Sequence, residues 1–255
     1  MIALASHSYL RLVREKVLML GLLAVVLLLA GYYVGLQGIA GYTVPIDAIS
    51  HPAGLANFLA MIVAVYLGVT LLGNDKSSGF MQVMMTKPMA PWQYLGGRVL
   101  GSLAMLATIW FVISAALIAM TFSLGESPGM FMVRYLAMAF IGQAMLFMVA
   151  VLLSQFITPL ASAILVLILT DRVFVNFGDN IASYQGPTVI KAVALWMIKV
   201  IYYIVPQISA FQLWGTEKAI PLISPLDIAL SVAYGISYFL LIFSLCVLVF
   251  ERRDW

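Results

Sequence analysis

Long apolar runs separated by short polar segments make up most of this chain. An α-helix needs about 20 mainly apolar residues to cross the hydrocarbon core of a bilayer, and six runs come close to that length or exceed it. We therefore predict an all-α integral membrane protein with six transmembrane helices, over residues 17–36, 55–72, 96–122, 135–153, 160–177 and 226–250.

A further apolar stretch, residues 187–206, is open to two interpretations. It is long enough to span a bilayer, but it contains Lys191 and Lys199 and is bracketed by prolines. A seventh span would move the basic C-terminus to the outside, against the rule that cytoplasmic loops carry the excess of Lys and Arg. We favour a re-entrant or interfacial helix between spans five and six on the outer side, with Trp196 as an interfacial anchor.

Composition supports the membrane assignment and excludes several classes of protein. Of the 255 residues, 64% are hydrophobic and 9% are charged, whereas a soluble domain usually has about a quarter charged residues. The net charge of +3 is small and dispersed, which argues against binding to nucleic acid. Six spans leave no room for a large soluble domain, so we expect a single membrane domain over residues 1–255.

The few charges predict the topology. Basic residues gather before the first predicted span, between the second and third, and after the sixth, at Arg11, Arg14, Lys16, Lys76, Lys87, Arg98, Arg252 and Arg253. Since cytoplasmic loops are enriched in Lys and Arg, we expect a multi-pass protein of the cell (inner or plasma) membrane with both termini in the cytoplasm.

Residue patterns typical of enzyme active sites are missing from the sequence. It has no G-x-x-x-x-G-K-[ST] string to hold a nucleotide phosphate and no G-x-S-x-G turn of a serine hydrolase. Its one cysteine is Cys246, and its two histidines, His7 and His51, are predicted on opposite sides of the membrane. We therefore expect neither an enzyme nor a chain with a cofactor or metal of its own.

The polar segment between the second and third predicted spans, residues 73–101, is the most informative part of the sequence. Pro88 and Pro91 are expected to end a short helix there, and Gly96 and Gly97 to loosen the start of the next span. Taken alone, these residues are consistent with a connector that dips into the lipid headgroups or with a docking helix for a cytoplasmic motor. Four apolar side chains would share one face of this short helix: Phe80, Met81, Met84 and Met85.

The order of residues in this segment resembles the loop after the second span in the ATP-binding-cassette (ABC) type-2 permease family. That loop has an acidic residue, a glycine, several apolar positions, a proline, and a glycine-rich basic start of the third span. Two other stretches are similar to family segments: 201–214, IYYIVPQISAFQLW, to the outer segment between spans five and six, and 249–255, VFERRDW, to the C-terminus. The loop positions are Asp75, Gly79, residues 80–85, Pro88, Gly96, Gly97, Arg98 and Gly101.

The resemblance implies a permease subunit of an exporter, driven by a separate ATPase. ATP would be bound by that partner, and two ABC ATPase subunits and a second permease copy or a related paralogue would complete the complex in the lipid bilayer. Arg98 is expected to extend to the headgroups from the mouth of the third span. The residues implied in docking the ATPase are Asp75, Lys76, Gly79, Phe80, Met81, Met84, Met85, Lys87 and Pro88.

A second group of residues is a candidate for the translocation path or its outer gate. Asp171 and Arg172 are opposed charges within the fifth predicted span, where ionisable groups usually face a cavity or a partner. If the fifth helix ends before them, they lie instead at the outer rim. With them we place Tyr202, Tyr203 and Pro206 of the outer segment.

The N-terminal residues 6–16 mix Leu10 and Val13 with basic side chains. This pattern is consistent with an interfacial helix below the first span or with a disordered tail. We expect little of the function to depend on it.

Two other functions stay open. A mechanical transmitter of the same architecture would pass ATP-driven motion to an extracytoplasmic partner without moving a substrate. An ion-coupled secondary carrier is less favoured, because such carriers usually contain inverted repeats with broken helices and the sequence has no evident symmetry of that kind.

Overall fold

The structure, a computed structural model, describes residues 1–14, 47–77, 90–123, 130–168, 188–211 and 225–252, together with residues 19, 22, 23, 25–31 and 34. Over these residues the chain is helical, with short turns and no strand. The elements are α1 (Ile2–Arg14), α3 (Asp47–Ser77), α5 (Pro91–Ser123), α6 (Met130–Ser154), α7 (Pro159–Ile168), α9 (Thr188–Ile204), the 3-10 helix η1 (Ile208–Phe211) and α10 (Pro225–Glu251).

Four of these helices are long and apolar enough to cross a membrane: α3 over Ala53–Gly73, α5 over Pro91–Ser123, α6 over Met132–Ser154 and α10 over Leu226–Glu251. They contain four of the six predicted spans, so an all-α membrane protein is confirmed in that coarser form. The described part of the chain contains four candidate spans where the sequence predicts six. Helix α7 includes nine residues of the predicted fifth span, 160–168. The rest of that span and part of the first lie outside the described residues.

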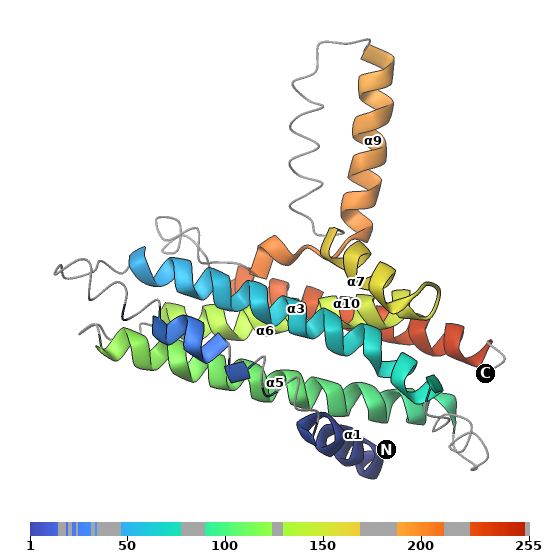
Figure 1. Ribbon diagram of the computed structural model, residues 1–255. Coiled ribbons are helices and arrows are strands. Elements are labelled where there is room, and N and C mark those ends of the chain that lie inside the picture. Colours follow the sequence, from blue (N-terminus) through green and yellow to red (C-terminus); the bar gives the residue numbers. More distant parts are fainter. Residues whose placement is uncertain are drawn as a thin grey trace.

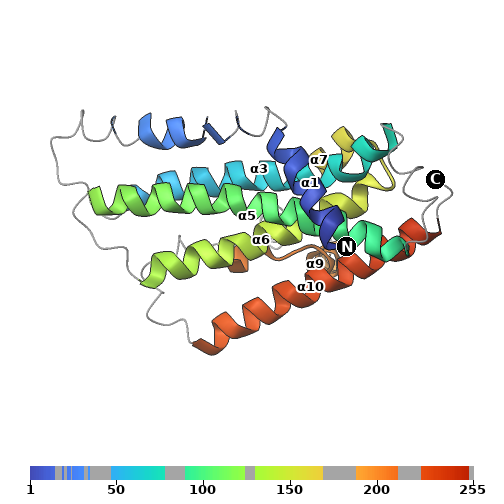
Figure 2. The ribbon, with the colours of Figure 1, turned by 90° about the horizontal axis from the view of Figure 1, so that it is seen from below.

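The helices α3, α5, α6 and α10 run side by side as a bundle (Figure 1). Helix α1 lies across α5 near one end of this bundle, and α10 ends at the same end (Figure 2). We call this the basic end, because Arg11, Arg14, Arg98 and Arg252 lie there.

Small residues set the close packing of α3 against α6. Ala53, Ala56, Ala60 and Ala64 follow one face of α3 and are all buried. Further along the same helix, a Cβ on Gly68 would lie 2.6 Å from the Phe147 carbonyl oxygen. Two helices approach this closely in a membrane only where side chains are small, because packing rather than the hydrophobic effect then drives their association.

A few hydrogen bonds cross the apolar interior. The Gln143 amide of α6 donates to Asn57 Oδ1 of α3 at 3.0 Å, and the Trp110 indole of α5 donates to the Leu136 carbonyl of α6 at 2.7 Å. Such bonds between spans each contribute up to about 1–2 kcal/mol. Because hydrogen bonds are directional, they help to fix the relative orientation of helices whose interface is otherwise apolar.

The chain leaves helical geometry between α9 and η1, within the bundle. Phe211 of η1 is buried and packs against Gly142 of α6 and Gly235 of α10. Backbone groups at membrane depth need hydrogen-bond partners inside the protein, and two α10 tyrosines supply them here. The Gln207 N–H donates to the Tyr234 hydroxyl at 3.3 Å, and the Tyr238 hydroxyl donates to the Ile204 carbonyl at 3.1 Å.

Helix α9 covers most of the stretch 187–206 and stands away from the bundle, with its axis across those of the long helices (Figure 1). Its 17 residues are not among the four candidate spans. A re-entrant or interfacial position for this stretch stays a prediction, as does the alternative of a seventh span.

Substitution of Tyr238 by Phe should lower the stability of the bundle by about 1 kcal/mol, because the Ile204 carbonyl loses its donor. Tyr66→Phe is the matched control, since the Tyr66 hydroxyl makes no hydrogen bond among the described residues. Thermal unfolding in detergent measures both. Equal unfolding midpoints for the two variants would contradict a role of Tyr238 in stabilising the non-helical backbone between α9 and η1.

Candidate functional site: a buried charge network at the basic end

The polar segment between the second and third predicted spans is shorter than the sequence indicates. Helix α3 continues to Ser77 and α5 begins at Pro91, which leaves residues 78–90 between them. Pro91, expected to end the preceding short helix, is instead the first residue of α5. Proline suits that position because its missing N–H has no helical partner there. The Ala90 N–H is capped by Gln93 Oε1 at 3.3 Å.

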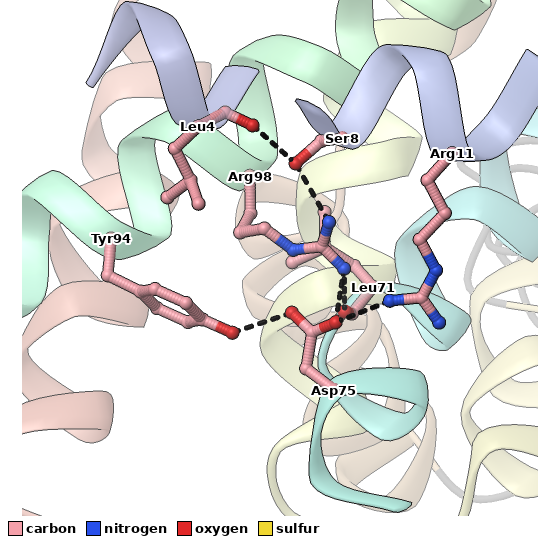
Figure 3. A network of polar contacts seen from close by, with 7 residues as sticks. All are labelled: Leu4, Ser8, Arg11, Leu71, Asp75, Tyr94 and Arg98. Carbon is pink, nitrogen blue, oxygen red and sulfur yellow. Dashed lines mark hydrogen bonds and ion pairs between the residues drawn. The ribbon is translucent and has the colours of Figure 1, made fainter. Parts of the chain in front are cut away.

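Asp75 lies near the end of α3, and its side chain is 0% exposed. Its carboxylate accepts from three side chains (Figure 3). The Tyr94 hydroxyl donates to Oδ2 at 2.6 Å, Arg11 Nη1 donates to Oδ1 at 2.9 Å, and Arg98 Nη2 also donates to Oδ1. The acid is thus bonded from both α1 and α5.

Arg98 is buried as well, at 6% exposure. Besides Asp75, its guanidinium donates to Ser8 Oγ at 2.8 Å and to the Leu71 carbonyl at 3.5 Å. The Ser8 hydroxyl in turn donates to the Leu4 carbonyl at 2.8 Å, so the chain of bonds runs into α1. The expectation that Arg98 extends to the lipid headgroups is wrong, because a counter-charge and two further acceptors hold it inside the protein.

Glycines of α5 allow α1 to lie close enough for these bonds. A Cβ on Gly97 would lie 2.9 Å from Leu4 Cδ2, and one on Gly101 would lie 2.5 Å from the Ala5 carbonyl oxygen. The expectation that Gly96 and Gly97 loosen the start of a span is therefore wrong. They lie inside α5, on the side that α1 covers.

The N-terminal segment is an amphipathic helix over Ile2–Arg14, so a disordered tail is wrong, whereas a position at the membrane interface stays a prediction. Leu4 and Ser8 of α1 are buried against α5, whereas Leu10 is exposed. Leu4, Ser8 and Arg11 are spaced by four and three residues and so share one face of a helix. That face supplies two of the polar groups around Asp75 and Arg98.

The network joins the two ends of the segment 78–90. Asp75 precedes that segment and Arg98 follows it, and α1 closes over both. An ion pair removed from water is held strongly in place, because leaving either charge unpaired costs about 3–5 kcal/mol. The ends of α3 and α5 are therefore held together as one unit with α1.

The other predicted site residues are not brought together by the described structure. Lys76 lies on α3 and Tyr202 and Tyr203 lie on α9, but their side chains fall outside the described residues. Pro206 is buried and lies two residues before η1. Outside the described residues altogether are Gly79, Phe80, Met81, Met84, Met85, Lys87, Pro88, Asp171 and Arg172.

Sequence reasoning missed Arg11 and Tyr94 as partners of Asp75 and Ser8 as a partner of Arg98. One signal was present: Gly97 and Gly101 form a G-x-x-x-G pattern, which marks a helix face that another helix approaches closely. Which helix approaches it is a property of the tertiary structure. Among the described residues no group of three or more His, Cys, Asp or Glu side chains is placed to hold a metal ion.

Comparison with known proteins adds no relative: no protein-family model and no curated protein matches this sequence.

Proposed function

We propose that this chain is the permease subunit of an ABC transporter, an exporter driven by a separate ATPase that docks on residues 79–88. The observation that supports this proposal most directly is the buried Asp75–Arg98 pair, which joins the two helices on either side of that segment. The order of motifs along the sequence is the second support.

A motor subunit that pushes on a loop moves the spans efficiently only if the loop is attached to a stiff base. Here a force on residues 79–88 reaches α3 through Ser77 and α5 through Pro91. Because Asp75 and Arg98 cannot separate without exposing an unpaired charge in the interior, both helices would move together. Helix α1 would follow them through Ser8 and Arg11.

The proposed topology places the basic end in the cytoplasm, where Lys and Arg are enriched. The complete assembly would have six spans in each permease, a second permease copy or a paralogue, and two ATPases that bind ATP. In the proposed docking segment Met84 and Met85 supply an adaptable apolar contact.

Co-purification tests the proposal. The full chain, expressed with its genomic neighbours and extracted in mild detergent, should bring down an ATPase subunit. The double variant Met84→Glu, Met85→Glu should reduce the recovered ATPase at least about tenfold, because two buried apolar contacts become charges. The matched control, Met84→Leu with Met85→Leu, should retain it.

Two results would count against the proposal. A folded permease that binds no ATPase removes the main claim. Equal recovery of the ATPase with the glutamate and leucine variants shows that the docking site lies elsewhere.

A further inference from the structure

A small cavity lies where α1, α3 and α5 meet, next to the charge network. Its volume is about 10 Å³, close to the space that one buried water requires. Arg11 and Thr70, which are partly exposed, line its mouth. The residues of its floor are all buried, at 6% exposure or less: Leu67, Leu71, Arg98 and Ser102.

Ser102 is the polar side chain in the floor that needs a partner. It is 5% exposed, and its hydroxyl makes no hydrogen bond with any described residue. Ser102 Oγ is nevertheless accessible from the cavity, in contrast to Arg98 Nε, which is sealed off on all sides. Because burial of a hydroxyl without a partner is unfavourable, a molecule in the cavity would gain a hydrogen bond from Ser102 that the protein itself does not use.

The other polar groups in the walls decide what kind of molecule can bond here. A guanidinium group only donates, so Arg11 requires an acceptor. The Thr70 hydroxyl already donates to the Tyr66 carbonyl at 2.8 Å, so towards the cavity its oxygen can only accept. A bare anion accepts but does not donate, and a cation donates but does not accept. Water does both and matches the volume.

We propose that this cavity holds one ordered water that joins α1, α3 and α5. The water accepts from the Arg11 guanidinium, donates to Thr70 Oγ1 and forms a third hydrogen bond with Ser102 Oγ. Three hydrogen bonds are typical of a buried water. The water adds a polar link between α1 and α3 to the Arg11–Asp75 pair. This site does not depend on the proposed transport function.

Radiolytic oxidation tests the proposal. A brief X-ray exposure converts bound water into hydroxyl radicals, which oxidise the side chains that the water touches, and peptide mass spectrometry locates the products. In the full chain in mild detergent, Leu67 and Leu71 should be oxidised several-fold more than Leu106, which is equally buried but does not line the cavity. A radical scavenger in the bulk solvent should suppress the oxidation of exposed Leu10 and leave that of the two cavity leucines unchanged.

Two variants remove the water in different ways. Ser102→Val replaces the hydroxyl by methyl groups that fill the floor, and Thr70→Val keeps the shape of the side chain but removes the acceptor. In each variant, oxidation of the two cavity leucines should fall to the level of Leu106. Thr121→Val is the matched control and should leave the oxidation unchanged, because Thr121 also donates to the carbonyl four residues before it but lies outside the cavity.

Three results would overturn the proposal. Oxidation of the cavity leucines no higher than that of Leu106 shows that the cavity is dry. Unchanged oxidation in the folded Ser102→Val and Thr70→Val variants places the water elsewhere. Oxidation that appears only after the chain has been stripped of lipid shows that a lipid group, and not water, occupies the cavity in the membrane.

Discussion

Replacement of Asp75 by Ala should destabilise the basic end by about 3–5 kcal/mol, which is the usual consequence of removing one partner of a buried ion pair. Arg98 would keep a buried positive charge with only Ser8 Oγ and the Leu71 carbonyl as acceptors. The Tyr94 hydroxyl, which bonds to Asp75 Oδ2, would lose its acceptor at the same time. Unfolding midpoints in detergent, measured by heat or by denaturant, report the change.

The matched control is Glu251→Ala, at an exposed carboxylate on the same end of the bundle. It should change stability by less than about 1 kcal/mol, because exposed charges contribute little. The double variant Asp75→Leu, Arg98→Met should recover most of the loss, since replacing both members of a buried pair by apolar groups is often neutral. If Asp75→Ala alone has the same small effect as Glu251→Ala, the network does not hold the helix ends together.

Gly101→Ala should detach α1 from α5. The added methyl would lie 2.5 Å from both the Ala5 carbonyl oxygen and Ser8 Cβ, and a backbone atom of a packed helix cannot move aside cheaply. Overpacking of this kind costs about 1–3 kcal/mol. We expect the amides of residues 2–14 to exchange with deuterium at least about tenfold faster, while the centre of α5 stays protected.

Gly54→Ala provides the matched control, because nothing lies within 4 Å of a Cβ built at Gly54. Alanine there should be neutral or slightly stabilising, by up to about 1 kcal/mol, since it is the better helix former. Unchanged exchange of α1 in the Gly101→Ala variant would contradict the close packing of α1 on α5.

The two experiments separate the parts of the network. Asp75→Ala removes the charge that Arg11 and Arg98 share, whereas Gly101→Ala displaces Ser8 and leaves the Asp75–Arg98 pair intact. In the proposed transporter, both variants should weaken the coupling of ATP hydrolysis to movement of the spans. Only the first should strongly reduce the stability of the bundle.

The long helices could be predicted from the sequence because the length of an apolar run is a local property. The predicted spans at 55–72, 96–122, 135–153 and 226–250 each lie inside an observed helix. The errors are at the helix ends. Helix α3 continues past the apolar run because Asp75, a residue that suggests a loop, is neutralised by Arg11 and Arg98.

The role of Arg98 could not be predicted in the same way. An arginine near the end of an apolar helix commonly extends to the headgroups, and nothing adjacent in the sequence indicates otherwise. Its partners come from residues 8, 71 and 75. Ser8 reaches it because α1 crosses α5 at Gly97 and Gly101, and residues 71 and 75 reach it because α3 packs against α5. The rotation of each helix about its axis decides which side chains meet. That rotation cannot be read from the residues next to Arg98 in the sequence.

Gln155 illustrates the same limit. In the sequence it is one polar residue of a short connection between two apolar runs. Its significance comes from being buried with no partner at a corner that three helices enclose. Burial and hydrogen-bond satisfaction are properties of the packed chain.

The sequence by itself thus determined that this is a helical membrane protein and where its long helices approximately lie. The length of an apolar run can be read locally, and a chain in a bilayer must satisfy its backbone hydrogen bonds internally, which favours helices. The tertiary structure decided which charges pair, why α5 has glycines at 97 and 101, and which amide is buried without a hydrogen-bond partner among the described residues. These depend on how helices distant in the sequence pack, since the favourable energy of a buried charge or amide lies in contacts that exist only after the helices meet.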